Sequence, residues 1–236
     1  MIIKYKYLNI FKAINRIVDC VFPRSCKSCT AILNTYEQLL CLKCNKNLHY
    51  YDSYYRYNVI SSLQNDSEYI SVLLCYHKHG VMRRLIHSFK YESHIELGRL
   101  FAGWQIEQII DIHKNIPIDY VVPVPMHSDK LRKRGYNQVV PYAKTIAELL
   151  GVPYTDKILK KSKNTKTQSK QNAKERMLNI SGSFDLISTY DLNGKHLLIT
   201  DDIITTGATM LAVINMLKSK YNCKISIAAI AVTVME

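Results

Sequence analysis

The possible folds of this 236-residue chain are limited chiefly by the segment Leu197–Thr209, which reads LLITDDIITTGAT. An apolar run leads into two adjacent aspartates, a short loop of threonines and glycine follows, and an apolar helical pattern begins. A buried strand that passes through a polar turn into a helix is the repeating unit of parallel α/β sheets, whose ligands bind at the carboxyl ends of the strands. The segment therefore predicts an α/β fold with a ligand site at this turn.

The same turn carries the groups of a sugar-phosphate site. A glycine allows the main chain to approach a phosphate closely, and the amides at the start of the next helix bind anions. The phosphate-binding candidates are Thr205, Thr206, Gly207, Ala208 and Thr209. Asp201 and Asp202 are acceptors that suit ribose hydroxyls, and they are the catalytic candidates as well. No Walker-type P-loop occurs in the sequence. A simple helix cap is the alternative, but a cap needs one such residue rather than six.

Apolar periodicity elsewhere in the chain predicts the same fold class. We expect strands at residues 71–76, 119–124, 196–200 and 225–234, and helices at 81–89, 94–112, 137–150 and 208–217. Strands that read as continuous apolar runs belong to a largely parallel sheet that helices cover on both faces. Residues 160–174 have no apolar periodicity, so they are predicted to form a mobile loop.

Composition divides the chain into four parts. We expect an amphipathic helix in residues 1–22, a zinc ribbon in 23–51, a polar linker in 52–69 and the α/β domain in 70–236. The N-terminal helix packs on its own protein or, alternatively, lies at a membrane surface. The sequence shows no uninterrupted run of about 18 apolar residues and no convincing secretion signal. We therefore expect a cytoplasmic protein without a transmembrane segment.

Four of the seven cysteines form two C-x2-C pairs, which eleven residues separate; they are Cys26, Cys29, Cys41 and Cys44. Four thiolates at this spacing close a tetrahedron around Zn²⁺, and metal binding would supply the folding free energy that so short a stretch lacks. Two redox-active pairs are the alternative. Because all four positions are filled, we predict a structural rather than a catalytic zinc ion. The other cysteines, Cys20, Cys75 and Cys223, lie among apolar residues and are predicted to be buried thiols.

The net charge of +13 is concentrated in two segments. Residues 1–60 carry nine basic and three acidic side chains, and residues 120–181 carry thirteen and four. Such a concentration favours a polyanionic ligand, either a nucleic acid or a phosphorylated small molecule. The alternative is that the chain is simply rich in lysine and that these lysines bind no ligand. It explains the number of lysines but not their concentration in one segment.

The segment Leu197–Thr209 closely resembles the phosphoribosyl pyrophosphate (PRPP) motif of type I phosphoribosyltransferases. Further blocks follow the order of the ComF family of competence and DNA-uptake proteins: the two cysteine pairs, LIHSFKY at 85–91, VPVPMH at 122–127, RKRGYNQ at 132–138 and a block at 164–184. Roughly residues 20–235 resemble this family. The resemblance implies a type I phosphoribosyltransferase fold with a small N-terminal four-cysteine zinc-ribbon module.

Resemblance and side-chain chemistry together suggest roles for individual residues. Val124 and Pro125 match the loop that contacts pyrophosphate through backbone amides. Arg132 and Arg134 are forked donors that suit phosphate oxygens. Lys90 is either a further phosphate contact or a surface lysine. The loop at 160–174 resembles the hood that closes over PRPP, and its basic side chains equally suit a DNA backbone; the hood or DNA candidates are Lys133, Gln138, Lys166, Gln168 and Arg176.

The ComF resemblance implies a role in DNA uptake or natural transformation, in which the protein handles single-stranded DNA beside a helicase-like partner. Two alternatives remain open. One is an active phosphoribosyltransferase that uses Mg²⁺ together with PRPP, and the other is a non-catalytic scaffold that docks a helicase-like partner through the zinc ribbon. Residues 160–180 offer no aromatic side chain on which an acceptor base would stack. The sequence therefore favours a PRPP-type pocket over any particular transfer reaction.

Overall fold

The computed structural model describes residues 23–52, 58–92, 94–162, 183–187 and 190–234. The chain divides into two compact units, residues 1–48 and residues 49–236. The predicted N-terminal helix, residues 163–174 of the predicted hood and the candidates Lys166, Gln168 and Arg176 lie outside the described residues. Among the described helices, none combines the length and the apolar character of a membrane span.

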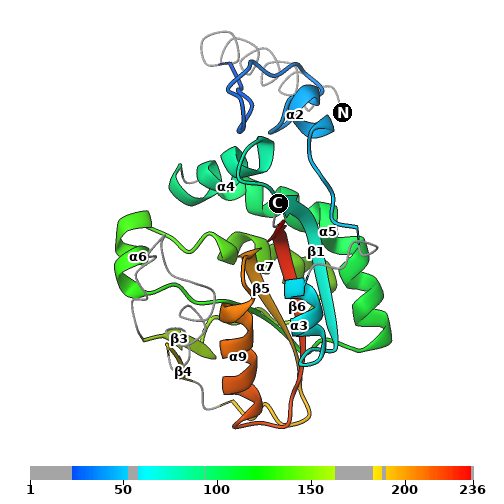
Figure 1. The fold of residues 1–236 in the computed structure, drawn as a ribbon, viewed down its shortest axis with the longest axis vertical. Helices are drawn as coiled ribbons and strands as arrows, with labels where there is room; N and C mark the ends of the chain where they lie inside the picture. Colours follow the sequence, from blue (N-terminus) through cyan, green and yellow to red (C-terminus); the bar gives the residue numbers. More distant parts are fainter. Residues whose placement is uncertain (1–22, 53–57, 93, 163–182, 188–189, 235–236) are drawn as a thin grey trace, which may run out of the picture. The chain divides into compact units, whose positions relative to one another are not determined.

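Four parallel strands form the centre of the larger unit (Figure 1). These are β1 (Tyr69–Tyr76), β2 (Tyr120–Pro123), β5 (His196–Ile204) and β6 (Lys224–Thr233), and they lie in the order β1-β6-β5-β2. Every pairing between them is parallel, and the central strands β5 and β6 are buried along almost their whole length. Apolar residues therefore run through these strands without alternation because both faces are covered. The predicted fold class is confirmed.

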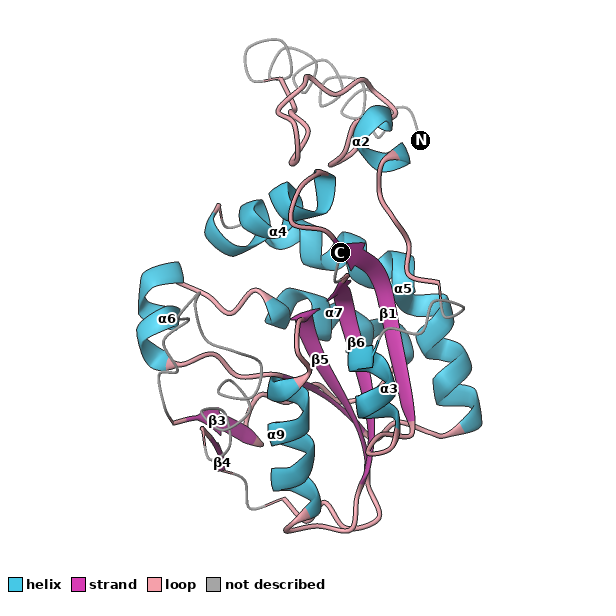
Figure 2. Ribbon diagram, in the orientation of Figure 1, coloured by secondary structure: helices cyan, strands magenta, loops and turns pink. Residues whose placement is uncertain are grey.

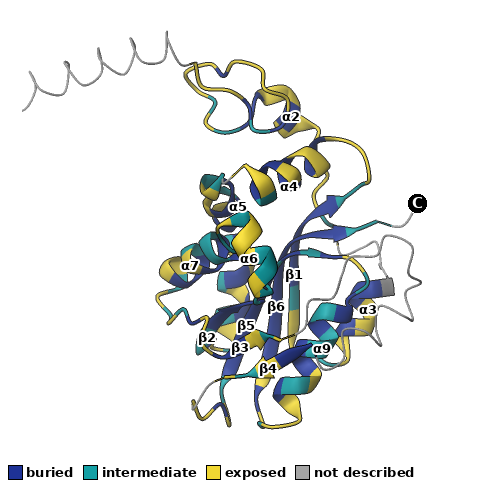
Figure 3. Ribbon diagram, turned by 90° about the vertical axis from the view of Figure 1, so that its left-hand side faces the viewer, coloured by how far each residue is buried: buried dark blue, intermediate teal, exposed yellow. Residues whose placement is uncertain are grey.

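Helices cover both faces of this sheet. The described helices of the larger unit are α3 (Asn58–Gln64), α4 (Val81–Tyr91), α5 (Ile95–Asn115), α6 (Ser128–Arg134), α7 (Val139–Leu150) and α9 (Ala208–Lys218). On one face α5 packs against α7, and these two helices contact β1, β2 and β5. Figures 2 and 3 show α3 and α9 on the opposite face, with the strands between the two layers.

The boundaries of these elements follow from local sequence signals. The predicted apolar stripe of α4 is its buried side, which includes Val81, Leu85, Ile86 and Phe89. Helix α7 ends at Gly151, whose φ of 69° lies in the left-handed region that a glycine adopts without a steric penalty. Periodicity and capping thus placed the predicted helices within a few residues of the observed ones.

Strand β5 continues further than the sequence predicts. The prediction ends at Thr200, but the strand runs on through both aspartates to Ile204. The reason is that β6 continues beside it, with Asp201 opposite Ala229 and Ile204 opposite Val232. The two carboxylates are therefore held by a paired strand at the edge of the ligand turn rather than by the turn itself.

Helix α3 (residues 58–64) lies within the predicted polar linker at 52–69. Its Val59, Ile60 and Leu63 are buried and belong to the core on the α9 face of the sheet. Three apolar residues within one turn and a half supply the face that drives this helix onto the sheet. The polar neighbours of these residues hide the pattern in the sequence.

The predicted loop at 160–174 also begins differently. Lys160 and Lys161 belong to β3 (Leu159–Lys161), which pairs in antiparallel fashion with β4 (Phe184–Leu186). Leu159 and Phe184 are buried, so this small sheet has an apolar anchor at each strand. Its two strands come from segments more than twenty residues apart, and such long-range pairing leaves no local sequence signal.

Short additional pairings cover part of each edge of the central sheet. Tyr50 forms an antiparallel bridge with Leu74 of β1, although the sequence analysis assigned residues up to 51 to the zinc ribbon. On the other edge, Tyr154 forms a parallel bridge with Val121 of β2. The N–H of Val121 donates to Pro153, and the N–H of Thr155 donates back to Val121.

Candidate functional site

Asp202 is a buried carboxylate with partners from three different elements. Lys90 at the end of α4 places Nζ 2.9 Å from Asp202 Oδ2, and Gln138 Nε2 donates to the same oxygen at 2.7 Å. The N–H of Ile203 donates to Oδ1 at 2.7 Å. Burial alone would raise the pKa of Asp202, but Lys90 and these hydrogen bonds hold it below its ordinary value. Asp202 is therefore a fixed negative charge that is already paired.

Asp201 differs from Asp202 in its pKa and in its hydrogen bonds. Burial and the neighbouring charge of Asp202 raise the pKa of Asp201 to about 8. Its Oδ1 accepts from the N–H of Asp202 at 2.8 Å, and among the described residues its Oδ2 makes no hydrogen bond. Near neutral pH this side chain is thus mostly a carboxylic acid with one oxygen available. Such a group can donate to a sugar hydroxyl as well as accept from one.

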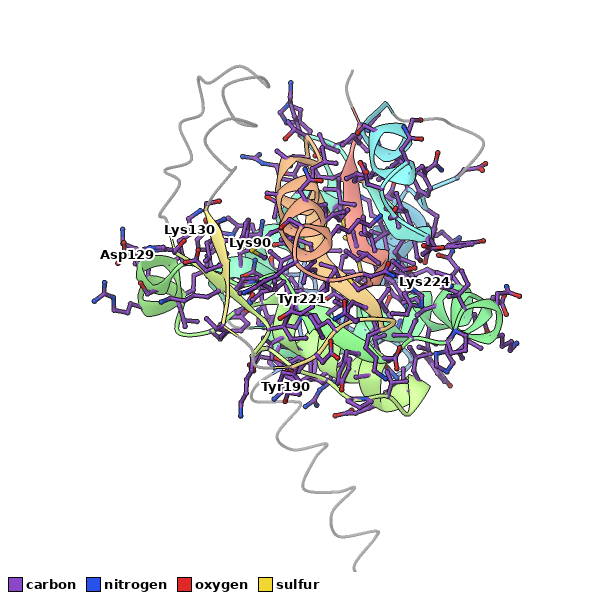
Figure 4. All side chains as sticks on the ribbon, turned by 90° about the horizontal axis from the view of Figure 1, so that it is seen from below. Lys90, Asp129, Lys130, Tyr190, Tyr221 and Lys224 are labelled. Carbon is purple, nitrogen blue, oxygen red and sulfur yellow. The ribbon has the colours of Figure 1, made fainter. Side chains whose placement is uncertain are left out.

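Positive side chains surround this pair of aspartates. Besides Lys90, the cluster contains Lys130 of α6 and Lys161 of β3. Burial, followed by the charges of Arg134 and Lys90, lowers the pKa of Lys130, and burial, followed by the charge of Lys130, lowers the pKa of Lys161. Figure 4 shows Lys90 and Lys130 at the same end of the molecule, away from Lys224. An anion between these cations would relieve their mutual repulsion.

Arg134 connects the cluster to α4. Its NH1 donates to Gln138 Oε1 at 3.0 Å, its NH2 donates to Tyr91 Oη at 3.4 Å, and its guanidinium carbon lies 5.0 Å from the centre of the Tyr91 ring. The hydrogen bonds from Arg134 to Gln138 and from Gln138 to Asp202 therefore fix the Arg134 guanidinium beside the carboxylates. Of the two predicted arginines, this is the one that the structure brings to the aspartates.

Arg132 and Lys133 point away from the cluster. Both are exposed, and Arg132 forms an ion pair with Asp129 on the same exposed stretch of α6. Helix geometry explains the difference for Arg132, because Lys130 and Arg134 are four positions apart and share one face of α6, whereas Arg132 is two positions from each of them. The predicted assignment of Arg132 to the phosphate site is therefore not supported by its position.

The pyrophosphate contacts predicted for Val124 and Pro125 need a correction. The N–H of Val124 donates to the carbonyl of Thr200 at 2.9 Å, as an extension of the pairing between β2 and β5. Proline has no N–H to donate. The carbonyl of Val124 accepts from Asn137 Nδ2 at 3.1 Å. These two residues thus shape the loop, but they offer no backbone donor to a ligand.

The predicted phosphate loop joins β5 to α9. Gly207 has a φ of 74°, and a Cβ built on it would lie 3.0 Å from Val59 Cγ2 of α3. Glycine is therefore required here twice, for its backbone conformation and for the space that α3 occupies. Thr205 is exposed and Thr206 and Thr209 are half-buried, whereas Ala208 is buried as the first residue of α9. The first amides of α9 have no acceptor within the helix, and amides at helix starts are groups that can bind anions.

Sequence reasoning missed Lys130, Lys161 and Tyr91. Tyr91 directly follows Lys90, and Lys130 lies one helical turn before Arg134, so each stood next to a residue that was singled out. Lys161 lies in the predicted loop at 160–174, whereas the structure has it in β3. The convergence of these three side chains depends on how α4, α6 and β3 come together, and only the α6 spacing could have been read from the sequence.

The small unit gathers the four predicted metal ligands. Their Sγ atoms all lie within 4.8 Å of one another, and those of Cys29 and Cys41 are 3.7 Å apart. Tetrahedral Zn²⁺ with bonds of about 2.3 Å needs sulfur atoms about 3.8 Å apart. Cys41 caps helix α2 (Leu42–Lys46) and accepts from the N–H of Cys44. The cluster could therefore hold a metal ion such as zinc. Cys75 and Cys223 are buried, as predicted.

Comparison with known proteins agrees with this arrangement. A family model described as a phosphoribosyl transferase domain matches residues 137–234, from the start of α7 to the end of β6. The chain is 24% identical over 210 residues to Competence protein F of Haemophilus influenzae, and the match covers 84% of this chain and 92% of that protein. The chain is thus similar over most of its length to a competence protein, and residues 137–234 resemble a phosphoribosyl transferase domain.

Other relatives match a shorter stretch of the chain. The DNA utilization protein YhgH of Salmonella typhi is 26% identical over 136 residues, which is 56% of this chain and 59% of that protein. Among solved structures, a purine phosphoribosyltransferase from Pyrococcus horikoshii covers 56% of this chain and 74% of its own, with 20% identity and a TM-score of 0.37. A TM-score this low carries no argument, so the fold assignment rests on the strands, the helices and the family model.

Proposed function

We propose that the larger unit binds a ribose phosphate that carries a pyrophosphate group, of which PRPP is the model compound. The observation that carries this proposal is the pair Asp201 and Asp202, one available and one already paired, beside a glycine-dependent loop at the carboxyl end of β5. The loop and the first amides of α9 suit a terminal phosphate, and Asp201 suits the ribose hydroxyls.

Charge complementarity supports the same ligand class. Two aspartates face four cations, Lys90, Lys130, Lys161 and Arg134, and one of the aspartates is mostly neutral near pH 7. The cluster therefore has a surplus of positive charge in a partly buried place. A compound with several phosphate charges would neutralise this surplus and so bind more tightly than an uncharged sugar.

The donor set is compatible with Mg²⁺ bound together with the ligand. The carboxylate of Asp202 is occupied by Lys90, Gln138 and Ile203, so Asp201 Oδ2 is the oxygen that the pair offers to a hard cation. Mg²⁺ would supply neutralisation of the pyrophosphate charge. Because Asp201 must lose its proton to ligate a metal, we expect this contribution to grow as the pH rises toward about 8.

Titration calorimetry with PRPP and Mg²⁺ tests this site with two matched arginines. Arg134→Ala removes a donor fixed beside the carboxylates, and we expect the affinity to fall roughly 10-fold to 100-fold. Arg132→Ala removes the same kind of side chain two positions earlier, where it points into solvent, and we expect an effect of less than about 2-fold. A wild-type protein that binds no PRPP, or equal losses for the two variants, would contradict the proposal.

For the protein as a whole we propose a role in DNA uptake, through the handling of single-stranded DNA. Relatives named as a competence protein and as DNA utilization proteins support this role. The exposed Arg132 and Lys133 on α6 support it independently, because basic side chains in solvent suit a phosphate backbone. Both belong to residues 120–181, the segment with thirteen basic and four acidic residues.

The salt dependence of oligonucleotide binding tests the DNA role. The logarithm of the single-strand binding constant is expected to fall linearly with the logarithm of the salt concentration, with a slope of about −0.7 per phosphate contact. The double variant Arg132→Ala with Lys133→Ala should weaken binding and flatten this slope by about 1.4, while PRPP binding stays unchanged. Fluorescence anisotropy at several salt concentrations measures both quantities. DNA binding that is absent or insensitive to salt would count against the role.

A further inference from the structure

Tyr91 is an exposed aromatic ring that its neighbours hold in a defined orientation. Its exposed fraction is 61%, although it lies at the end of α4, one residue after the lysine that pairs with Asp202. The Arg134 guanidinium lies over the ring, and the ring of His87 lies 5.0 Å away at an angle of 43°. A tyrosine fixed in this way loses little conformational entropy when a flat ligand stacks on it.

The other exposed tyrosines of the described chain differ in this respect. Tyr36, Tyr50 and Tyr69 are all exposed, yet among the described contacts none of these three has a cation over its ring. Exposed tyrosines by themselves are ordinary surface residues. Tyr91 is distinguished by its arginine and by its place beside a phosphate-binding cluster.

Cations of that cluster lie within electrostatic range of Tyr91. Arg134 touches both Tyr91 and Gln138, whose amide in turn binds Asp202, and Lys130 lies one helical turn before Arg134 on α6. An aromatic ring, an arginine and a lysine at the same place are the elements with which proteins bind single-stranded nucleic acids: the base stacks on the ring and the cations hold the backbone.

We propose that an unpaired base of a DNA strand stacks on Tyr91, with an adjoining phosphate held by Lys130 and Arg134. This inference rests on the single-strand DNA role proposed above and names the place where the strand meets the ribose-phosphate cluster. It also supplies the stacking aromatic that is missing from residues 160–180. Stacking is tolerant of sequence because every base has a flat face, so the site would accept any base.

The test uses the full chain and a thymidine oligonucleotide that contains one 2-aminopurine, whose fluorescence is quenched on stacking. Tyr91→Ala is expected to weaken binding roughly 10-fold and to remove the quenching, since one stacked base contributes a factor of this order. Tyr91→Phe keeps the ring and should bind within about 2-fold of wild type, because the hydrogen bond that it loses is long at 3.4 Å. Tyr69→Ala removes an exposed tyrosine at the first residue of β1; it is the matched control and should change nothing.

A second arm replaces the bases of the oligonucleotide with abasic sites. Wild type should bind this strand as weakly as Tyr91→Ala binds the complete one, and Tyr91→Ala should not discriminate between the two strands. If Tyr91→Ala binds the complete strand as tightly as wild type, the stacking inference is wrong while the proposed DNA role stands. If wild type binds no strand at all, both fall, and calorimetry with PRPP shows whether the ribose-phosphate site remains.

Discussion

Removal of metal from the purified protein with a strong chelator is expected to unfold the described part of the small unit, residues 23–48. Few apolar side chains hold this part together: apart from three of the four cysteines, its buried apolar residues are Leu33, Leu40 and Leu48. Structural zinc contributes about 10–16 kcal/mol in modules of this kind, far more than three leucines can replace. Hydrogen exchange measured by mass spectrometry should show residues 23–48 losing their protection.

The larger unit provides the internal control for that experiment. Its sheet is built without the four metal ligands, so we expect its melting temperature to change by no more than about 2 °C. Cys29→Ser should lower the metal content below one ion per chain, whereas Cys75→Ser, at a buried thiol of β1, should leave it at one. Residues 23–48 that stay protected after complete removal of metal would show that the cysteine cluster is not what stabilises them.

Asp202→Ala is expected to produce the largest loss of stability among single changes at the carboxylate pair. The substitution leaves Lys90 and Gln138 without the carboxylate that satisfies both of them, at 2.9 Å and 2.7 Å. Breaking a buried ion pair of this kind costs about 3 kcal/mol or more. For a chain of this length that corresponds to a fall in melting temperature of roughly 6–12 °C, which differential scanning calorimetry would measure.

Asp129→Ala is the matched control for this change. It removes a carboxylate that is also paired with a basic side chain, but on the exposed face of α6, where such pairs contribute less than about 1 kcal/mol. Asp202→Ala should have a second effect, because the charge of Asp202 is one cause of the raised pKa of Asp201. The pKa of Asp201 should fall below about 8 in the variant, and NMR titration of its carboxyl carbon would detect this. A melting temperature equal to that of Asp129→Ala would refute the structural importance of the buried pair.

Local patterns account for the parts of the fold that could be predicted from the sequence. The predicted strand at 71–76 differs from β1 by two residues, and the predicted helix at 208–217 differs from α9 by one. Apolar runs, helical stripes and glycine caps are properties of neighbouring residues, so they are visible without the fold. The acidic pair and the loop after it were visible for the same reason.

The remainder of the site depends on contacts that no local pattern encodes. Lys90 pairs with Asp202, and the charge of Lys130 reaches Lys161, only because segments far apart in the sequence come together in the fold. The error at Val124 has a similar origin, since its N–H is taken by Thr200 of the neighbouring strand. Helix α3 was overlooked because its three apolar residues are set among polar ones. In each case the sequence does not reveal which distant segment packs against the residue in question.

The short pairings at the two borders of the central sheet have a consequence for self-association. A parallel sheet with free borders can recruit a strand from another molecule, which is the usual first step of aggregation. Here Tyr50 pairs with the edge strand β1 and Tyr154 with the edge strand β2. Main-chain donors and acceptors at those points of the two edges are therefore already used. Together with a net charge of +13, this arrangement disfavours growth of the sheet from one chain into the next.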